Sequence, residues 1–294
     1  MQLVTYNIRF GLGRDGKYNL KRIAQSVDGA DVVALQEVER YWERSGNVDQ
    51  VAEIASYLPA YYWVYGPAFD MDASARDESG NVLNQRRQFG TMLLSKTPII
   101  SSRLLVFGKL ASTAFSMELG AVEGLINTKA GPIRFYSLHL SHLRDRERLL
   151  QLKELLEQHR NWQYRGGAWT GAGDICSADW SAGQQCPPAT PHAILLGDFN
   201  SEPGSAPYNL LTGGEHTDMG LVSYMDEFVD SLTINHLGAS EHTHQADDPN
   251  RDQTKRRLDY CFISADIAHL IESSYVDIKS QGSDHFPYWV TINI

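Results

Sequence analysis

The chain has 294 residues, of which 42% are hydrophobic and 21% charged, and its formal net charge is −10. These values fit a single large α/β domain and exclude a disordered chain, and no stretch approaches the run of about 18 apolar residues that a membrane-spanning helix needs. The negative charge argues against a surface that neutralises many nucleic-acid phosphates, because such binding relies on Lys and Arg.

The first part of the sequence predicts alternating strands and helices. Residues 1–8 are rich in β-formers and predict a strand. Asn19 is a good helix N-cap, and the apolar spacing after it predicts a helix over 19–27. A strand over Val32–Leu35 and an amphipathic helix over 49–58 continue the alternation.

The alternation continues to the end of the chain. The polar, aperiodic stretch 70–88 predicts a loop, and the apolar stretch 89–95 after it predicts a strand. We also expect a helix over 144–159. Further strands are expected near 103–107, 121–127, 133–140, 193–197, 258–263 and 286–292.

Residues 161–191 read as a loop inserted into one domain that spans 1–294. The segment has few charges, no sustained period and three tryptophans, Trp162, Trp169 and Trp180. These tryptophans either pin the loop to the surface, which is the simpler interpretation, or wall a substrate cleft or touch a lipid surface.

The start of the chain and the cysteines bear on its compartment. The first ten residues lack the features of a signal peptide, so we expect a cytoplasmic protein. Cys176, Cys186 and Cys261 are expected to be free thiols. The alternative, a bridge between Cys176 and Cys186, implies an exported protein whose leader has been removed.

Polar side chains follow several of the predicted strands. Asp198 and Asn200 end the strand in "LLGDFNSEP", and because the side-chain period of a strand is two they project to the same face. Taken alone, the pair is equally typical of a strand-to-turn cap. Similar groups recur at other strand ends: Asn7, Glu37, Asp284 and His285. Mg²⁺ prefers carboxylate, carboxamide and water oxygens, and Mn²⁺ also accepts imidazole, so the set predicts a metal site.

Seven segments in order resemble one family of enzymes. They are "TYNIR", "LQEVE", "QFGTMLLSKTPI", "SLHLSH", "LLGDFNSEP", "RRLDYCFIS" and "GSDHFP", and they extend over residues 4–288. The set resembles the endonuclease/exonuclease/phosphatase superfamily of metal-dependent phosphohydrolases. The resemblance implies a four-layered α/β sandwich, in which two mixed β-sheets pack face to face with helices on both outer sides.

The resemblance also implies the metal ligands. Glu37 is then the principal Mg²⁺ ligand, with Asn7 beside it and Asp284 nearby. Asp198 orients or deprotonates the attacking water. Asn200 holds the phosphate or a second metal ion.

Three further residues take catalytic roles in the same way. His285 contacts the phosphate and is counted with the metal site. Asp259, in "RRLDY", accepts the other ring N–H of His285 and fixes its tautomer. His139, in "SLHLSH", is a phosphate-binding or proton-donating group on the opposite side.

Other polar residues support weaker predictions. Arg9 lies two residues after Asn7 and is a candidate phosphate contact, and Arg87 precedes a strand where it is a candidate contact for an anionic substrate. His142 is expected at the rim of the site. The sequence "EHTHQ" at residues 241–245 places His242 and His244 on one face, and we interpret them as a surface pair.

These observations favour a monomeric phosphohydrolase that uses Mg²⁺ or Mn²⁺ and cleaves a phosphodiester or phosphomonoester by direct water attack. A small-molecule or lipid-headgroup ester is favoured because the chain is acidic and lacks basic runs. One alternative is a nuclease acting on DNA or RNA. Another, from a different class, is a catalytically inactive protein that binds a phosphate ligand. We expect no stable membrane insertion.

Overall fold

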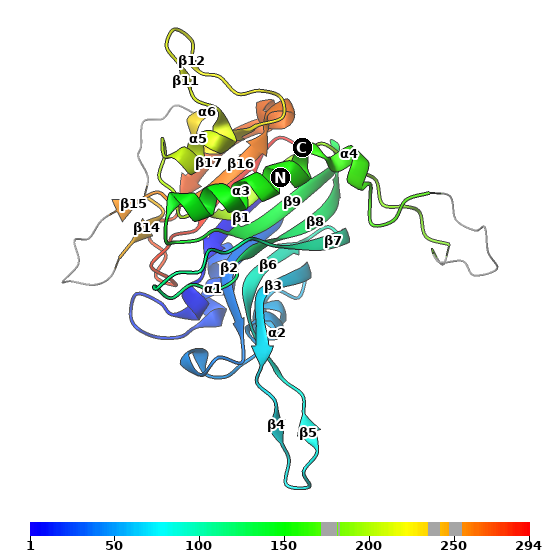
Figure 1. Ribbon diagram of the computed structural model, residues 1–294, viewed down its shortest axis with the longest axis vertical. Coiled ribbons are helices and arrows are strands. Elements are labelled where there is room, and N and C mark those ends of the chain that lie inside the picture. The colour runs from blue at the N-terminus through cyan, green and yellow to red at the C-terminus, as the bar shows by residue number, and fades with distance from the viewer. Residues whose placement is uncertain (172–180, 182, 235–241, 247–254) are drawn as a thin grey trace.

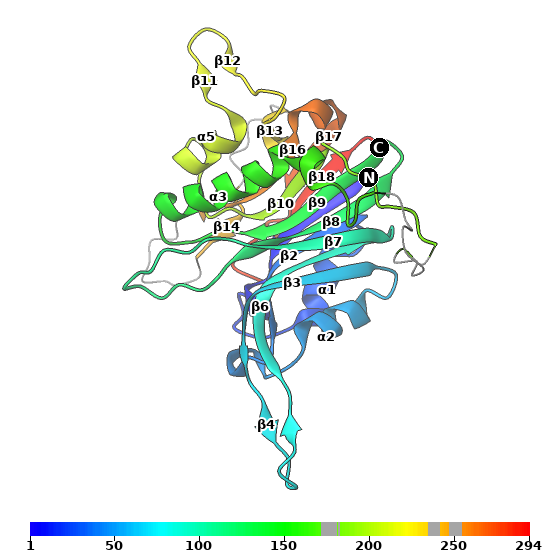
Figure 2. The ribbon, with the colours of Figure 1, turned by 45° about the vertical axis from the view of Figure 1, so that its right-hand side comes forward.

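Two six-stranded mixed sheets pack face to face in the computed structural model, and helices cover both outer faces (Figures 1 and 2). The structure describes the chain except for residues 172–180, 182, 235–241 and 247–254. This arrangement confirms the α/β sandwich predicted from the sequence.

The first sheet contains both ends of the chain. Strands β1 (Gln2–Asn7) and β2 (Val32–Arg40) at its centre are parallel, and every other pairing is antiparallel. Their pairing sets Asn7 opposite Gln36, so the residues that follow the strands begin at one edge of the sheet. The strand order is β17 (Ile271–Val276), β18 (Tyr288–Ile292), β1 (Gln2–Asn7), β2 (Val32–Arg40), β6 (Arg86–Ser95) and β3 (Tyr62–Asp72).

The second sheet repeats this plan. Its parallel pair, β9 (Gly131–His139) and β10 (Ala193–Asp198), sets His139 opposite Asp198. The antiparallel neighbour β16 (Asp259–Ser264) sets Asp259 opposite Asp198 on the other side. Three chemically active side chains therefore share one row across the sheet. The strand order is β13 (Phe228–Asp230), β16 (Asp259–Ser264), β10 (Ala193–Asp198), β9 (Gly131–His139), β8 (Gly120–Thr128) and β7 (Ile99–Val106).

The helices begin where their sequences provide caps. The Asn19 side chain accepts a hydrogen bond from the backbone N–H of Arg22, and Asp49 accepts one from Ala52. The first sheet is covered by α1 (Leu20–Val27) and α2 (Gln50–Tyr57). The second half of the chain contains α3 (Asp145–Arg160), α4 (Trp162–Arg165), α5 (Ala206–Thr212) and α6 (Ser231–Ile234). Along the whole described chain, short 3-10 helices lie at Arg9–Gly11, Glu43–Ser45 and Ala265–Leu270.

Three apolar layers hold the sandwich together. The layer between the sheets includes Leu3, Phe135 and Leu196, all fully buried. The other two layers lie between the first sheet and α1 and α2, and between the second sheet and α3 and α5. Successive strand residues point to opposite faces, so the two central strand pairs contribute side chains both to the layer between the sheets and to an outer layer. These strands are therefore buried on both faces.

Polar side chains also cross between the sheets below the strand ends. Gln36, on β2, accepts a hydrogen bond from the Thr5 hydroxyl at 3.3 Å and donates one to the Ser137 hydroxyl of β9 at 3.1 Å. Ser137 in turn donates to the Leu35 carbonyl at 3.1 Å. All of these contacts are buried. They fix the relative height of the two central strand pairs.

The predicted loop over 70–88 is wrong. Strands β3 and β6 extend through both ends of this stretch and form an arm that projects from the sandwich (Figure 1). Near its tip, β4 (Ala75–Arg76) pairs with β5 (Val82–Leu83). The arm is mostly exposed, so its strands need no buried face, and the apolar alternation that reveals other strands is missing.

The prediction from sequence did not include β3, α5, β13 and β17. The predicted loop insertion contains the short helix α4. Trp180 and the proposed bridge from Cys176 to Cys186 involve positions outside the described residues. Two further strand pairs are β11 (Glu215–His216) with β12 (Gly220–Leu221), and β14 (His244–Gln245) with β15 (Lys255–Arg256). Among the described residues, the helices are too short or too polar to cross a bilayer.

The polar crossing between the sheets can be tested by Ser137→Ala. The substitution leaves the buried amide of Gln36 and the carbonyl of Leu35 without this hydroxyl, and we expect it to lower the free energy of unfolding by about 1–3 kcal/mol. Urea denaturation measures the loss. Ser273→Ala, at an exposed position of β17, is the control and should change stability by no more than about 0.5 kcal/mol. Equal effects would show that the crossing contributes no stability.

Candidate active site

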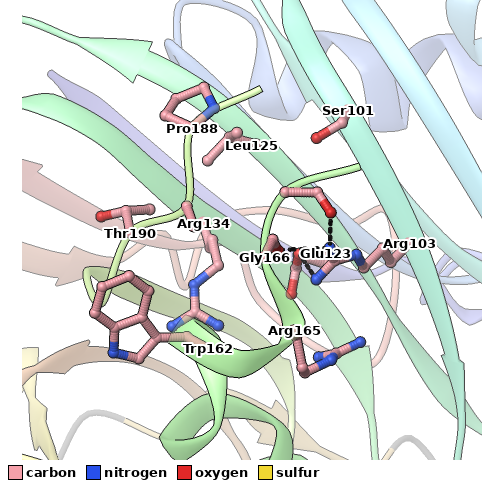
Figure 3. Close-up of a pocket in the computed structure, with 12 residues that line it drawn as sticks. Ser101, Arg103, Glu123, Leu125, Arg134, Trp162, Arg165, Gly166, Pro188 and Thr190 are labelled. Carbon is pink, nitrogen blue, oxygen red and sulfur yellow. Dashed lines mark hydrogen bonds and ion pairs between the residues drawn. The ribbon is translucent and has the colours of Figure 1, made fainter. Parts of the chain in front are cut away.

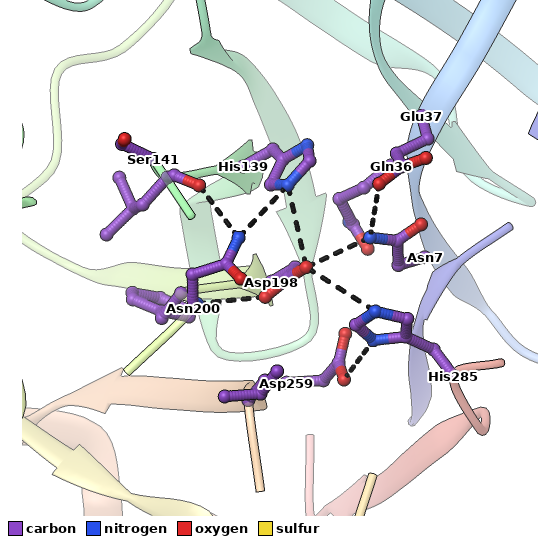
Figure 4. Close-up of polar contacts among 12 residues, drawn as sticks. Asn7, Gln36, Glu37, His139, Ser141, Asp198, Asn200, Asp259 and His285 are labelled. Atoms are coloured by element: carbon purple, nitrogen blue, oxygen red, sulfur yellow. Dashed lines mark hydrogen bonds and ion pairs between the residues drawn. The ribbon is translucent and has the colours of Figure 1, made fainter. Parts of the chain in front are cut away.

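Asp198 lies where the two sheets meet, and it contacts side chains from both. Its side chain is almost fully buried. One carboxylate oxygen, Oδ2, accepts a hydrogen bond from the amide of Asn7 at 2.9 Å and lies 3.5 Å from Nε2 of His139 and 3.8 Å from Nε2 of His285 (Figure 4). The other oxygen accepts the backbone N–H of Asn200 at 2.9 Å. The carboxylate is therefore held from several directions before any ligand arrives.

Glu37 reaches the site through an irregularity in β2. The pairing of β2 with β6 shifts between Leu35 and Val38, and Glu37 itself has a positive φ of 59°. A non-glycine residue in this region is unusual and costs conformational energy, and bulges of this kind redirect a side chain. Here the carboxylate of Glu37 accepts a hydrogen bond from the Asn7 amide at 3.1 Å. The Asn7 amide group thus lies between two carboxylates.

Asn200 and His139 form the opposite side of the site. Asn200 also has a positive φ, 49°, and its amide donates to the Leu140 carbonyl at 2.9 Å. That amide lies 3.3 Å from Nε2 of His139. The Nδ1 atom of His139 is buried and has no hydrogen-bond partner among the described residues.

A buried carboxylate orients His285. Oδ2 of Asp259 is 2.8 Å from Nδ1 of His285, and the Asp259 side chain is fully buried. The hydroxyl of Thr243 accepts the backbone N–H groups of Leu258 and Asp259 at 3.0 and 2.9 Å, which fixes the start of β16. Nε2 of His285 is left to face Asp198.

The charges of these groups are coupled. Burial alone raises the pKa of a carboxyl group, but the neighbouring His285 and His139 outweigh this and lower the pKa of Asp198. Burial alone lowers the pKa of the His285 imidazole, but the carboxylates of Asp259 and Asp198 outweigh burial and raise that pKa. Asp198 is therefore an anion that can accept a proton or face a cation.

The expected ligand Asp284 lies at the edge of this group, beside Arg9. Nε of Arg9 is 3.4 Å from a carboxylate oxygen of Asp284, and the arginine side chain is 32% exposed. This ion pair brings a positive charge to the rim. Arg9 therefore lies beside Asp284, but β1 ends at Asn7 and Arg9 begins a 3-10 helix, so the strand spacing from Asn7 does not account for its position.

The sequence interpretation of His244 as a surface residue is wrong. Its side chain is buried, its ring lies 4.7 Å from the ring of His285, and its Nε2 is 3.9 Å from a carboxylate oxygen of Asp284. Burial and the charge of His285 lower the pKa of His244 to about 4. The spacing of His242 and His244 indicated a shared face, but the sequence does not show that β14 pairs residue 244 with residue 285.

The two remaining predicted contacts lie farther out. His142 is exposed, and partial desolvation and the nearby His139 lower its pKa. Arg87 lies at the base of the arm, where its Nε donates to the Tyr41 carbonyl at 3.0 Å. Among the described residues, Arg87 makes no hydrogen bond or ion pair with Asp198.

Two sets of donors near Asp198 suit a divalent cation. Glu37 and Asp198 contribute carboxylates on either side of the Asn7 amide, the hard oxygen donors that such ions prefer. Asp198, Asp259 and His285 also have donor atoms within 4.8 Å of one another. In this second set Oδ2 of Asp259 already bonds Nδ1 of His285, which leaves Oδ1 of Asp259 and Nε2 of His285 as donors. The donors on the Glu37 side are all oxygens, the ligands that Mg²⁺ prefers, so donor chemistry favours that side.

The chain matches the family model described as the Endonuclease/Exonuclease/phosphatase family over residues 4–285. No match is found among curated protein sequences.

Solved structures with the same fold cover nearly the whole chain. A family protein from Leptotrichia buccalis C-1013-b has a TM-score of 0.65 and 18% identity, with 100% of each chain covered. A mannosyl-6-phosphatase from Bacteroides thetaiotaomicron VPI-5482 has a TM-score of 0.60 and 18% identity, with 99% of each chain covered. A 3′ phosphatase from Neisseria, bound to a product DNA hairpin, has a TM-score of 0.57 and 14% identity, again with 100% of each chain covered.

Gly197 tests how tightly Asp198 is positioned. A Cβ atom at this residue would lie 2.0 Å from the backbone oxygen of Leu138 on β9. Gly197→Ala must therefore separate β10 from β9, and we expect a loss of roughly 1–3 kcal/mol in the free energy of unfolding. Urea denaturation measures it. Gly214→Ala is the matched control, because a Cβ atom there meets nothing within 4 Å; equal stability of the two variants would contradict the close contact.

Proposed function

This chain belongs to the endonuclease/exonuclease/phosphatase family, whose members hydrolyse phosphoester bonds, and we propose that it is a Mg²⁺- or Mn²⁺-dependent hydrolase of a small-molecule or lipid phosphoester. The reaction is the direct attack of water on phosphorus. The observation that carries this proposal is the position of Asp198, a buried anion between two histidines and beside the carboxylate of Glu37.

The side chains divide the work of hydrolysis among them. Asp198 accepts the proton of the attacking water, because the neighbouring histidines keep it ionised. His285 contacts a phosphate oxygen through Nε2, while Asp259 holds the ring by Nδ1. On the other side, His139 contacts the phosphate or donates a proton to the leaving oxygen, and the amide of Asn200 lies beside it.

Glu37 and Asn7 would hold the cation, with Asp284 nearby. When bound, the ion offsets negative charge on the phosphate oxygens. Glu37 faces the site from the irregular part of β2, so the backbone conformation at this residue sets the direction of its carboxylate.

The preference for a small or lipid ester rests on charge. The net charge of −10 leaves no general attraction for a polyanion. Arg9, the basic residue placed at the rim, pairs with Asp284. Fold relatives include enzymes named for a sugar phosphate and for a DNA end, so DNA belongs in the test.

The test is a hydrolysis panel on the full chain with Mg²⁺, with Mn²⁺ and with EDTA. It includes aryl phosphate mono- and diesters, sugar phosphates, glycerophosphodiesters, sphingomyelin vesicles and DNA. We expect metal-dependent turnover of a small or lipid ester, which Asp198→Asn lowers by on the order of 10²- to 10³-fold. Turnover of DNA alone would overturn the substrate class. Binding of phosphate with no turnover of any ester would overturn the enzyme assignment.

The metal assignment is tested by Glu37→Gln. Removal of the carboxylate charge removes an oxygen donor, and we expect Mn²⁺ affinity to fall by roughly 10- to 100-fold. The paramagnetic resonance signal of free Mn²⁺ measures the affinity. Glu43→Gln, an exposed change on the same chain segment, should leave the affinity unchanged. A Glu37→Gln variant that binds Mn²⁺ like the unmodified chain would place the metal elsewhere.

The orienting role of Asp259 is tested against a second pair of the same geometry. Asp259 and His285 are 2.8 Å apart, and so are Asp266 and His192, a partly exposed pair at the start of β10. Asp259→Asn should lower kcat by about 10- to 100-fold, because His285 loses the acceptor that fixes its ring. Asp266→Asn is the control and should leave kcat unchanged.

Kinetics on the best substrate of the panel measure both variants, and urea denaturation checks that both fold. We expect the Asp259→Asn effect in kcat rather than in KM. Equal kcat values for the two variants would contradict the role of Asp259.

A further inference from the structure

A second polar hollow lies on the outer face of the second sheet, away from Asp198. It has a volume of about 340 Å³, including the solvent at its mouth. Its floor comes from β7, β8 and β9, and its wall from α4 and the ends of the 161–191 segment (Figure 3). Arg134 in the floor precedes His139 by five residues on β9, so it points to the opposite face, about 17 Å along the strand. The hollow is separate from the candidate active site.

Three arginines from three segments line this hollow. They are Arg103 of β7, Arg134 of β9 and Arg165 of α4, and the one carboxylate among the lining residues is Glu123. Glu123 is 3.8 Å from Arg103 and also accepts the hydroxyl of Tyr136. Three guanidinium groups and one carboxylate leave two positive charges in the lining.

His159 lies beside Arg134, and it is neutral, so it does not offset the positive charge of the arginine. Nη2 of Arg134 is 2.9 Å from Nδ1 of His159. Burial and the charge of Arg134 lower the pKa of His159 to about 4, so at neutral pH Nδ1 accepts the arginine hydrogen bond. The positive charge of Arg134 is therefore not balanced by His159.

Two of the arginines keep unused donors. Arg134 is only 6% exposed, yet its buried Nε has no hydrogen-bond partner among the described residues. The same holds for the buried Nη1 of Arg165. Buried donors without partners are rare in folded proteins. Arg103, in contrast, donates to the carbonyl groups of Gly166 and Gly167, which holds the segment after α4 against β7. Two of the three arginines thus have donors left for a ligand.

We propose that this hollow binds a phosphate group, as inorganic phosphate or a small phosphate ester. Arginine donors match phosphate oxygens in geometry, and the two positive charges match a phosphate dianion. Trp162 forms part of the wall beside the arginines. Binding joins α4 to the sheet and gives the two ends of the 161–191 segment a ligand-binding role. This site does not depend on the proposed function of Asp198.

The test follows the indole N–H signal of Trp162 in a ¹H–¹⁵N spectrum of the full chain, assigned with Trp162→Phe. Inorganic phosphate should shift this signal to saturation, whereas sodium chloride at the same ionic strength should not. Arg165→Gln should weaken the binding by about tenfold or more, because a charged donor is lost. Arg160→Gln is the matched control, since this arginine pairs with Asp226 at 2.9 Å outside the hollow.

Arg103→Gln is a second variant that removes a charge from the sheet side, and it should also weaken phosphate binding. Both hollow variants should keep the kcat of the unmodified chain. No saturable shift with phosphate, or unchanged binding by both variants, would overturn the site. Saturation by acetate at the same concentrations would overturn the phosphate assignment in favour of a carboxylate. None of these outcomes bears on turnover at Asp198, so the two proposals fail separately.

Discussion

The hydrogen bond from Asn7 to Asp198 is the contact on which the candidate site depends. Asn7 ends β1 of the first sheet, and Asp198 ends β10 of the second, so this 2.9 Å contact joins the two halves of the sandwich at the point where chemistry is expected. Both side chains are buried. A small shift of one sheet against the other would separate Glu37 from Asp198, and the polar crossing through Gln36 and Ser137 opposes that shift.

The site also contains conformational strain that the rest of the fold must offset. Glu37 and Asn200 have positive φ angles, and so do Arg9 and Phe10 just after Asn7. Such conformations cost on the order of 1–3 kcal/mol each when the residue is not glycine. Three apolar layers and two buried central strand pairs supply the stability that holds these residues in place. The arrangement preorganises Glu37 and Asp198, which is what electrostatic catalysis requires.

Much of this fold follows from local sequence, and the exceptions have physical reasons. The cap at Asn19 and the apolar period of α1 were sufficient to predict that helix. Asp198 and Asn200 do lie together, but β10 ends at Asp198 and Asn200 has a φ of 49°, so a turn at the strand end joins them and the period-two rule does not apply. The arm at 70–88 was missed because exposed strands carry no apolar alternation. His244 was missed because its burial depends on pairing with residue 285, a contact that local sequence does not contain. The polar hollow beside α4 likewise combines residues from distant strands.

The most direct test of the account is anomalous X-ray scattering from crystals of the full chain grown with MnCl₂. The account predicts a manganese peak beside the carboxylate of Glu37, adjacent to Asn7 and Asp198, with Asp259 still bonded to His285. A peak coordinated by Asp259 and His285, and not by Glu37, would contradict it. So would a crystal with no manganese near Asp198.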